Sequence, residues 1–406
     1  MELIDGIAVF GDPIETNALE QIQRTARADE RVRAAALMAD HHKGYGVPIG
    51  GVVAYQDAIS PAGVGYDIAC GNKAVLTDMS GADARAGITK IINDIAATIS
   101  FGVGRKNAER VDHDLFDDPA WSVIKHLPLR DRAAAQLGTV GSGNHYVDVF
   151  TDEQDRVWVG VHFGSRGFGH GIATWALKAG GAGDGMDVVP LVLSVDSDLG
   201  AEYIEAMHLA GRYAYAGRDW VCDRVIKILG AQKLDEVHNH HNFAWKEQHG
   251  GQDVWVVRKG ATPAFPGQRG FVGGSMGDDA VILVGVDPTN NPMAAAVNQE
   301  AALFSTVHGA GRVMSRNAAR GRRRKVGGRW EDDPAHPGRI SREDMQRWIA
   351  KRGVVLRGAD TDEAPQAYKR LPDVLRHHSG TVRILHTLSP IGVVMAGAGE
   401  FDPYKD

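Results

Sequence analysis

The sequence predicts an α+β fold, a single large domain over residues 1–406 in which mixed β-sheets surround a central cleft and helices flank the sheets. Segments typical of strands and of helices follow one another without strict βαβ alternation, which argues against a doubly wound sheet. Clusters of polar residues and glycine spread from residue 67 to residue 312, so one site has to be assembled by most of the chain. No internal repeat of about 20 to 50 residues occurs, which excludes solenoids and propellers.

Three segments carry helical patterns. Strong helix formers follow a capping residue at Asn17 and predict a helix to about Met38. Isoleucines between Ile88 and Ile99 recur with amphipathic helical spacing, and a long helical pattern runs from Ala201 to Leu229.

Short runs of apolar and β-branched residues predict the strands. The expected strands are Val52–Tyr55, Lys73–Leu76, Val157–Phe163, Val188–Val195, Asp253–Arg258, Val281–Val286, Thr381–Leu385 and Gly392–Met395. Residues 182–185 and 326–329 are candidate linkers, but neither is long enough to mark a domain boundary.

The composition is that of a globular chain, and its glycine content indicates many loops whose backbone lies close to neighbouring groups. Apolar residues make up 43% and charged residues 24%, and the 50 glycines exceed the usual share of roughly 7%. The net charge of −6 excludes a uniformly basic nucleic-acid coat but not a local basic patch. With only Cys70 and Cys222, no signal-peptide pattern and no apolar run long enough to span a bilayer, we expect a cytoplasmic protein without membrane association.

A carboxylate and a thiol three residues apart form the first candidate metal site. Asp67 and Cys70 lie in a glycine-flanked loop, and such a pair suits Zn²⁺ or Mn²⁺, with one sulfur able to bridge two ions. The alternative is that Cys70 is a small buried hydrophobic residue, as most free cysteines are.

Three histidines in polar or glycine-rich surroundings are further candidate ligands. His145 follows Gly143-Asn144, His162 ends an apolar strand before a Gly-Ser-Arg turn that contains Arg166, and His241 belongs to a run of imidazoles. Several adjacent imidazoles seldom all belong to a core, because each needs hydrogen-bond partners once it is buried. A tight turn and a satisfied core histidine remain the structural alternatives for His145 and His162.

Candidate phosphate-binding groups follow in the second half of the chain. Arg258 and Lys259 end a strand, and the Gly-Gly-Ser-Met-Gly turn around Ser275 offers backbone N–H groups. Both features also fit a solvated strand end and an ordinary loop.

His308 is the candidate nucleophile. Glycines surround it, Arg312 and Arg316 follow, and an imidazole nitrogen can attack phosphorus to form a covalent intermediate. A further metal ligand or a general acid is the alternative role. Residues 301–330 hold eight Arg or Lys and no Asp or Glu, a pattern that indicates either a polyanion contact or a solvated basic helix end.

In this order, the motifs around Asp67, His145, His162, His241, Arg258, Ser275 and His308 resemble those of the RtcB-type RNA ligase family. The resemblance covers most of the chain. It implies a GTP- and Mn²⁺-dependent enzyme that joins RNA 3′-phosphate or 2′,3′-cyclic phosphate ends to 5′-hydroxyl ends through a guanylylated histidine, in RNA repair or tRNA splicing.

The resemblance also implies roles for individual residues. Cys70 would bridge two Mn²⁺ ions, with His145 and His162 completing one site and Asp67 and His241 the other. His308 would take GMP from GTP. The expected nucleotide contacts are Asn144, Asp148, Ser275, Gly309, Arg312 and Tyr368, and the expected RNA-phosphate contacts are Arg166, Arg258, Lys259 and Arg316.

Two positions depart from the family pattern. Asp148 stands where the family has a glutamate that holds the guanine, and Ala396-Gly397 stands where the family has a terminal Lys-Gly, with Lys405 in the tail beyond it. These departures favour a divergent paralogue that binds GTP weakly or accepts another nucleotide. A two-metal phosphodiesterase acting on RNA ends and a non-catalytic RNA-end binding protein are the alternatives; the substrate RNA and any activating protein partner are not specified by the sequence.

Overall fold

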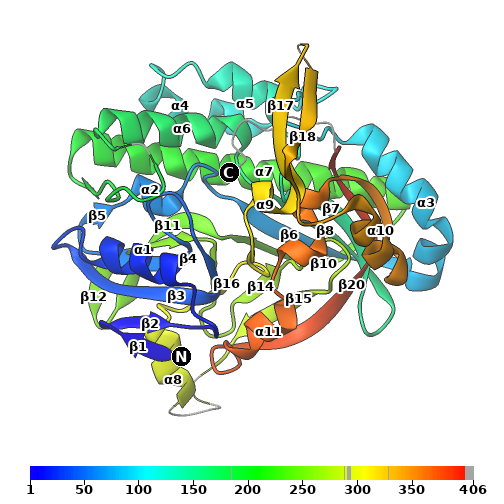
Figure 1. Ribbon diagram of the computed structural model, residues 1–406. Helices are drawn as coiled ribbons and strands as arrows, with labels where there is room; N and C mark the ends of the chain where they lie inside the picture. Colours follow the sequence, from blue (N-terminus) through cyan, green and yellow to red (C-terminus); the bar gives the residue numbers. More distant parts are fainter. Residues whose placement is uncertain (184, 288, 290–293, 328, 398–406) are drawn as a thin grey trace.

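The computed structural model describes residues 1–183, 185–287, 289, 294–327 and 329–397 (Figure 1). Two large mixed sheets lie side by side, and helices cover their outer faces. This arrangement confirms the predicted fold class. None of the helices in these ranges is both long enough and apolar enough to cross a membrane.

The first sheet has six strands in the order β1-β2-β3-β4-β12-β11. Its strands are β1 (Glu2–Ile4), β2 (Ile7–Val9), β3 (Val32–His42), β4 (Ile49–Tyr55), β12 (Gln252–Lys259) and β11 (Asn242–His249). Strands β2 and β3 are parallel and the other neighbours are antiparallel. The sheet therefore joins the first 55 residues of the chain to a hairpin from its middle.

The second sheet has eight strands, seven of them in the order β10-β6-β8-β7-β20-β15-β14, and β19 pairs with β20 in parallel. Its strands are β10 (Lys233–His240), β6 (Gly71–Ser80), β8 (Arg156–Phe163), β7 (Tyr146–Thr151), β20 (Val382–Gly397), β15 (Ala280–Gly285), β14 (Arg269–Val272) and β19 (Val355–Ala359). Three short pairs complete the strands: β5 (Ala58–Ile59) with β9 (Leu193–Ser194), β13 (Ala261–Pro263) with β16 (Ser305–Val307), and β17 (Gly321–Val326) with β18 (Arg329–Pro337).

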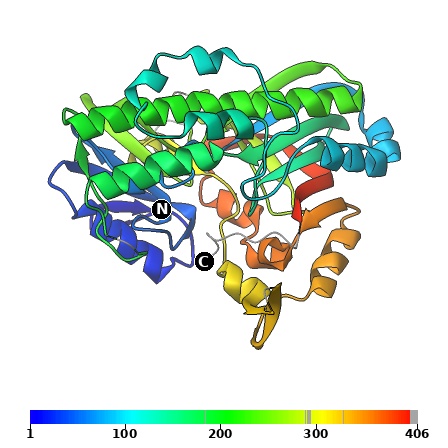
Figure 2. The same cartoon turned by 90° about the horizontal axis from the view of Figure 1, so that it is seen from above.

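One long helix joins the two halves of the core. Helix α7 (Asp198–Leu229) runs across the molecule (Figure 2) and is capped by Ser197 and by Gly230, whose φ of 65° is left-handed. The other helices are α1 (Thr16–Ala26), α2 (Pro61–Val64), α3 (Gly81–Thr98), α4 (Ala120–Val123), α5 (Arg130–Gln136), α6 (Arg166–Ala179), α8 (Ala294–Ala301), α9 (Arg316–Arg320), α10 (Arg342–Lys351) and α11 (Leu371–Arg376).

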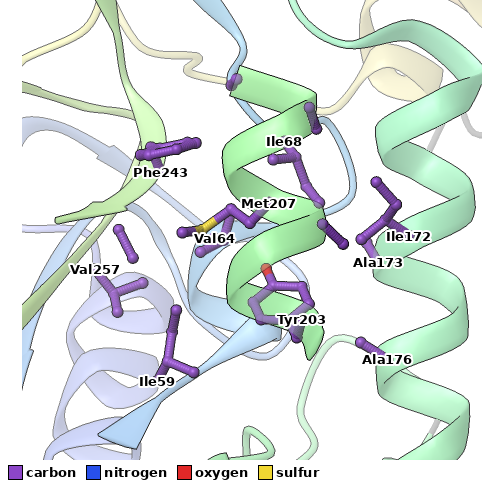
Figure 3. Packing of buried hydrophobic residues seen from close by; sticks show 14 of the residues in the cluster. Ile59, Val64, Ile68, Ile172, Ala173, Ala176, Tyr203, Met207, Phe243 and Val257 are labelled. Carbon is purple, nitrogen blue, oxygen red and sulfur yellow. The ribbon is translucent and has the colours of Figure 1, made fainter. Parts of the chain in front are cut away.

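The first half of α7 packs between α6 and the strands of the first sheet. Figure 3 shows Tyr203 and Met207 of α7 between Ile172 of α6 and Phe243 of β11. Ile68 belongs to the same buried cluster and is fully buried. The apolar core therefore fixes the short loop that carries Asp67 and Cys70.

Most of the expected elements are present, and four expectations need correction. The helices predicted over Ile88–Ile99 and Ala201–Leu229 are α3 and α7, and the strands predicted near residues 52, 73, 157, 253 and 281 are β4, β6, β8, β12 and β15. The helix expected from Asn17 to Met38 ends at Ala26, and β3 begins at Val32. Ala35, Ala36 and Ala39 of β3 are buried, and pairing with the neighbouring strands overrides their helical propensity.

The other corrections concern strands and a linker. In Val188–Val195 only Leu193–Ser194 pair as a strand, and Val189 is 60% exposed. The two strands expected at Thr381–Leu385 and Gly392–Met395 are one strand, β20, whose register shifts at Pro390. Such a bulge lets a residue without an N–H lie within a strand. The expected linker at residues 326–329 is not a linker, because Val326 ends β17 and pairs with Arg329, the first residue of β18.

Candidate metal centre and nucleotide pocket

A cavity of about 250 Å³ opens between the two sheets. It brings together thirteen of the sixteen site residues expected from the sequence. They are Asp67, Cys70, Asn144, His145, Asp148, His162, His241, Ser275, His308, Gly309, Arg312, Arg316 and Tyr368. Arg166, Arg258 and Lys259 do not line it.

A cluster of sulfur and nitrogen atoms lies on one wall of the cavity. Cys70 Sγ is 3.6 Å from His145 Nε2 and 3.7 Å from His162 Nε2. One ligand atom from each of the three residues lies within 4.8 Å of the others, the spacing of a group that can hold an ion. Asp67 Oδ2 is 3.0 Å from His145 Nε2, so the carboxylate belongs to the same cluster.

Hydrogen bonds to the protein orient the ring of His162 toward the cysteine. Asn72 donates from Nδ2 to the Phe271 carbonyl at 2.9 Å, which leaves its Oδ1 to accept from His162 Nδ1 at 2.6 Å. The proton is thereby assigned to Nδ1, and Nε2 keeps its lone pair, which Asn144 Nδ2 approaches at 3.3 Å. A buried acceptor behind a histidine is typical of metal ligands.

The ring of His145 is held in a similar way. Its Nδ1 lies 3.0 Å from the Val140 carbonyl, and its Nε2 faces Asp67 and Cys70. Arg166 Nη1 lies 3.0 Å from the same Nδ1. The guanidinium occupies the space above Gly141, where an added Cβ would come within 1.5 Å of Arg166 Nη2. Arg166 therefore lies directly behind the candidate metal site.

The protonation states fit a cation-binding cluster. Burial lowers the pKa of His162 and of His241 well below the usual value, so both imidazoles are neutral, the form that ligates metal. Burial, together with the Asp67 carboxylate, raises the pKa of the Cys70 thiol well above its usual value. A thiolate at this position therefore requires a nearby cation, as a metal ion would provide.

His241 connects the metal cluster to His308. Its ring stacks on His162 with the centroids 5.2 Å apart, and the centroid of the His308 ring lies 4.9 Å from that of His241. His241 Nδ1 is buried without a hydrogen-bond partner. A buried nitrogen with no partner next to a thiol and two imidazoles fits a ligand position that a bound ion would satisfy.

Asp40 holds His308 from behind. Asp40 Oδ2 accepts a hydrogen bond of 2.6 Å from His308 Nδ1 and further bonds from the backbone N–H groups of His308 and Gly309. Burial would raise the pKa of Asp40, but the ion pair and hydrogen bonds with His308 lower it below its usual value. Gly311, with a φ of 73°, lets the chain pass so close that an added Cβ would lie 2.2 Å from the Asp40 carbonyl.

Asp40 was not among the residues expected from the sequence. It lies in β3, two residues beyond the end of the expected helix. The Asp-His-His sequence at Asp40, His41 and His42 was the available signal, because adjacent titratable residues at the end of an apolar run commonly belong to a site.

The opposite wall of the cavity is an arginine and carboxylate network. Arg312 donates from Nη1 to Tyr368 at 2.9 Å and to Glu363 Oε2 at 3.2 Å, and its guanidinium lies over the Tyr368 ring. Arg316 pairs with the other oxygen of Glu363 at 2.9 Å, and the Tyr368 hydroxyl contacts Glu363 as well. Glu363, in the short 3₁₀ helix Thr361–Glu363, was not expected from the sequence.

Asp148 and Ser275 lie deeper in this part of the cavity. Burial raises the pKa of the Asp148 carboxyl well above its usual value, and its Oδ1 has no hydrogen-bond partner. Ser275 donates to Asp278 at 2.7 Å. Asp148 therefore offers a ligand in this pocket an oxygen atom that has no hydrogen-bond partner in the protein.

Arg258 and Lys259 were expected to contact phosphate, and the structure places both inside the protein. Arg258 is fully buried and is held by Glu247, Ser305 and the Leu303 carbonyl. Lys259 donates from Nζ to the carbonyls of Tyr45 and Ala62 at 2.6 and 3.1 Å. Both cations end β12, which has β4 and β11 as neighbours, and their side chains contact protein acceptors and not solvent.

The basic segment expected at residues 301–330 forms α9 and the hairpin β17–β18, which projects from the body in both views (Figures 1 and 2). Arg316 lines the cavity, whereas Arg322, Arg324 and Lys325 are exposed on the hairpin. Ala396 is buried near the end of β20, and Lys405 lies outside the described residues.

The fold and this cavity define a mixed α/β protein with a candidate His/Cys metal centre. The sequence matches the family described as "tRNA-splicing ligase RtcB" over residues 21–127 and 118–396. The chain therefore belongs to this family.

Three curated relatives span nearly the whole chain. The chain is 29% identical to the RNA-splicing ligase RtcB of Escherichia coli strain K12, with 94% of each protein covered. It is 29% identical to the tRNA-splicing ligase RtcB of Thermococcus kodakarensis, with 93% and 91% covered. It is 32% identical to the tRNA-splicing ligase RtcB of Pyrobaculum aerophilum, with 89% and 87% covered.

Proposed function

We propose that this protein is a GTP- and Mn²⁺-dependent RNA ligase that joins a 3′-phosphate or 2′,3′-cyclic phosphate end to a 5′-hydroxyl end through a guanylylated His308. The observation that carries this proposal is the position of His308 between a candidate metal cluster and a buried carboxylate. Family membership and the names of the curated relatives support an RNA ligase.

The donor set fits a pair of Mn²⁺ ions. Cys70, His145 and His162, whose donor atoms converge, would hold one ion. Cys70, Asp67 and His241 would hold the other, with Asp67 beside His145 and the His241 imidazole neutral. A mixed set of sulfur, nitrogen and oxygen suits this class of divalent ion. Bound metal would neutralise phosphate charge and polarise the phosphorus toward attack.

His308 is the residue that forms the covalent bond. Because Asp40 accepts from Nδ1, the lone pair of Nε2 is the nucleophile. Nε2 attacks the α-phosphorus of GTP, the N–P bond forms, and the bond to pyrophosphate breaks. The imidazole gains positive charge in this step, and the Asp40 carboxylate behind it offsets that charge.

The second half of the reaction uses the same histidine as leaving group. An oxygen of the RNA 3′-phosphate attacks the guanylyl phosphorus, and the electron pair of the N–P bond returns to His308. The 5′-hydroxyl then attacks the activated 3′-phosphate and expels GMP. A cyclic phosphate is first opened by water to a 3′-phosphate.

The pocket beside His308 supplies the nucleotide contacts. Arg312, fixed by Glu363 and Tyr368, would place a cation next to the phosphate chain, and Gly309, Ala310 and Gly311 line the cavity beside it. Asp148 and Ser275 would contact the base side of the pocket. The shorter Asp148 predicts weaker selection of guanine, so GTP and ATP should be compared.

The test is RNA joining with purified protein, Mn²⁺ and each nucleotide in turn. One RNA ends in a 3′-phosphate and the other begins with a 5′-hydroxyl. We expect a joined product that depends on a nucleoside triphosphate and that His308→Ala eliminates, with Leu3→Ala on exposed β1 as the matched control.

Two results would contradict the proposal. Opening of a cyclic phosphate without nucleotide, and no joining under any nucleotide, would favour a two-metal phosphodiesterase. RNA binding without metal in the protein and without any change in the RNA ends would favour a non-catalytic end-binding protein.

A further inference from the structure

Two neighbouring aromatic side chains lie unusually open to solvent. Among the Phe, Tyr and Trp side chains that the structure describes, Tyr45 and Tyr66 are the most exposed, at 42% and 38%. Their ring centroids are 6.3 Å apart and the rings are nearly perpendicular. Large aromatic rings are usually covered by other side chains. Two adjacent exposed rings therefore indicate a candidate binding surface.

A third ring extends this surface. Tyr66 stacks on the half-buried His170 of α6 with centroids 5.2 Å apart and an angle of 27° between the rings. We call Tyr45, Tyr66 and His170 the aromatic platform. Its rings come from the loop before β4, the loop after α2, and α6, three segments far apart in the sequence.

The platform adjoins the candidate metal centre. Tyr66 directly precedes Asp67, which lines the cavity, and His170 lies one helical turn after Arg166, whose Nη1 reaches His145. Arg166 and His170 both belong to α6, so this helix carries one contact to the metal cluster and one ring of the platform.

The loops that carry the two tyrosines are anchored from inside the protein. Lys259 Nζ donates to the Tyr45 carbonyl at 2.6 Å and to the Ala62 carbonyl at 3.1 Å, and Ala62 lies in α2, just before Tyr66. A buried lysine thus ties both loops to β12. This anchoring keeps the exposed rings close to each other and beside the cavity.

We propose that the aromatic platform stacks an unpaired base of the RNA strand whose end occupies the cavity. The proposal rests on the proposed function, because it takes RNA to be the substrate. Exposed flat π-faces are the chemistry that stacks the bases of single-stranded nucleic acid, and stacking of this kind tolerates any base. The platform thereby selects an unpaired end over a paired one.

The experiment measures the affinity of a short single-stranded RNA with a 3′-phosphate by fluorescence anisotropy at fixed salt. Wild type is compared with Tyr66→Ala, with Tyr66→Phe, and with Leu3→Ala as a distant exposed control. Each of the last three nucleotides of the RNA is replaced in turn by an abasic nucleotide, and every protein variant is measured with every abasic RNA.

We expect Tyr66→Ala to bind the intact RNA roughly 5- to 150-fold more weakly, and Tyr66→Phe and Leu3→Ala to bind as wild type does. On one abasic RNA the difference between wild type and Tyr66→Ala should disappear, because no base is left to stack. Equal affinity of Tyr66→Ala and wild type, or a loss that persists on every abasic RNA, would overturn the proposal.

The metal content of each variant and its nucleotide adduct are measured in parallel. If wild type forms the nucleotide adduct but Tyr66→Ala does not change RNA affinity, the stacking proposal is refuted and the ligase mechanism is not. The predicted RNA effect without any adduct in wild type would refute the ligase mechanism alone.

Discussion

Asp40 determines which nitrogen of His308 faces the cavity. Its carboxylate is fully buried and accepts from Nδ1 and from two backbone N–H groups, so the loop and the ring are oriented together. An imidazole with a fixed tautomer needs no reorganisation before it attacks phosphorus.

Replacing Asp40 by Asn should slow adduct formation on the order of 100-fold, because the amide can donate to Nδ1 and so stabilise the wrong tautomer. The rate of nucleotide transfer to the protein is measured at saturating nucleotide, with metal content as a second reading. A normal rate in a variant that retains its metal would show that Asp40 has no orienting role.

Lys259 gives a pH-dependent prediction. Burial lowers its pKa to about 7, so between about pH 7 and pH 10.5 the folded state holds fewer protons at this site than the unfolded state. The free energy of unfolding of wild type relative to Lys259→Met should therefore rise with pH in this window, by at most about 1.4 kcal/mol per unit. Urea unfolding of both proteins near pH 7 and pH 9 checks it, and a constant difference would contradict it.

At the residue scale, the sequence identified the groups that lie in motifs. Cys70, His145, His162, His241 and His308 stand beside glycines or polar residues, and the cavity collects all of them. Residues that act from behind these groups were missed. Asn72, Asp40 and Glu363 lie in ordinary strand or turn sequence, and only the folded geometry shows what they contact.

At the scale of elements, α7 supports the metal centre from behind. Its Arg218 is fully buried and donates to the carbonyls of Ala69 and Phe163, which flank Cys70 and His162, and to His238. One side chain thus ties the ends of β6 and β8 to the helix. Arg218 is a positioning residue for the two ligands.

We expect Arg218→Leu to lower the free energy of unfolding by about 2–5 kcal/mol, because two buried carbonyls lose their donor. Its affinity for Mn²⁺ should also fall. Arg212→Leu on the same helix removes a half-exposed ion pair to Asp118 and should cost less than about 1 kcal/mol. Urea unfolding and Mn²⁺ titration measure both, and equal effects of the two variants would contradict the assignment.

The elements that were mispredicted share one cause. Strand β3 is rich in alanine and resembles a helix locally, and β20 was expected as two short strands. In both cases pairing with strands distant in sequence determines the structure. Helices α3 and α7 were predicted because their apolar pattern is local.

For the whole molecule, the cavity depends on contacts across almost the full chain. Its lining runs from His42 to Met395, and β3, β6, β8 and β11 each bring one part to it. No periodicity in the sequence encodes that convergence. The order of the motifs indicated it only through resemblance to a family.

Bound metal should stabilise the folded protein. Mn²⁺ at about 100 times its dissociation constant should raise the free energy of unfolding by about 2.7 kcal/mol, since the unfolded chain lacks the site. A chelator should remove this stabilisation. The Mn²⁺ effect should be absent in Cys70→Ala and present in Cys222→Ala, which changes a buried residue of α7. Thermal unfolding with Mn²⁺ and with chelator is the measurement. The same Mn²⁺ effect in Cys70→Ala would place the ion elsewhere.

The covalent adduct is the most direct test of the account. Protein is incubated with Mn²⁺ and GTP radiolabelled at the α-phosphate, and the labelled peptide is identified after proteolysis. We predict acid-labile label on the peptide that contains His308, lost in His308→Ala and retained in Leu3→Ala. Label on another residue, or none with any nucleoside triphosphate, would contradict the claim that the metal cluster activates nucleotide for transfer to His308.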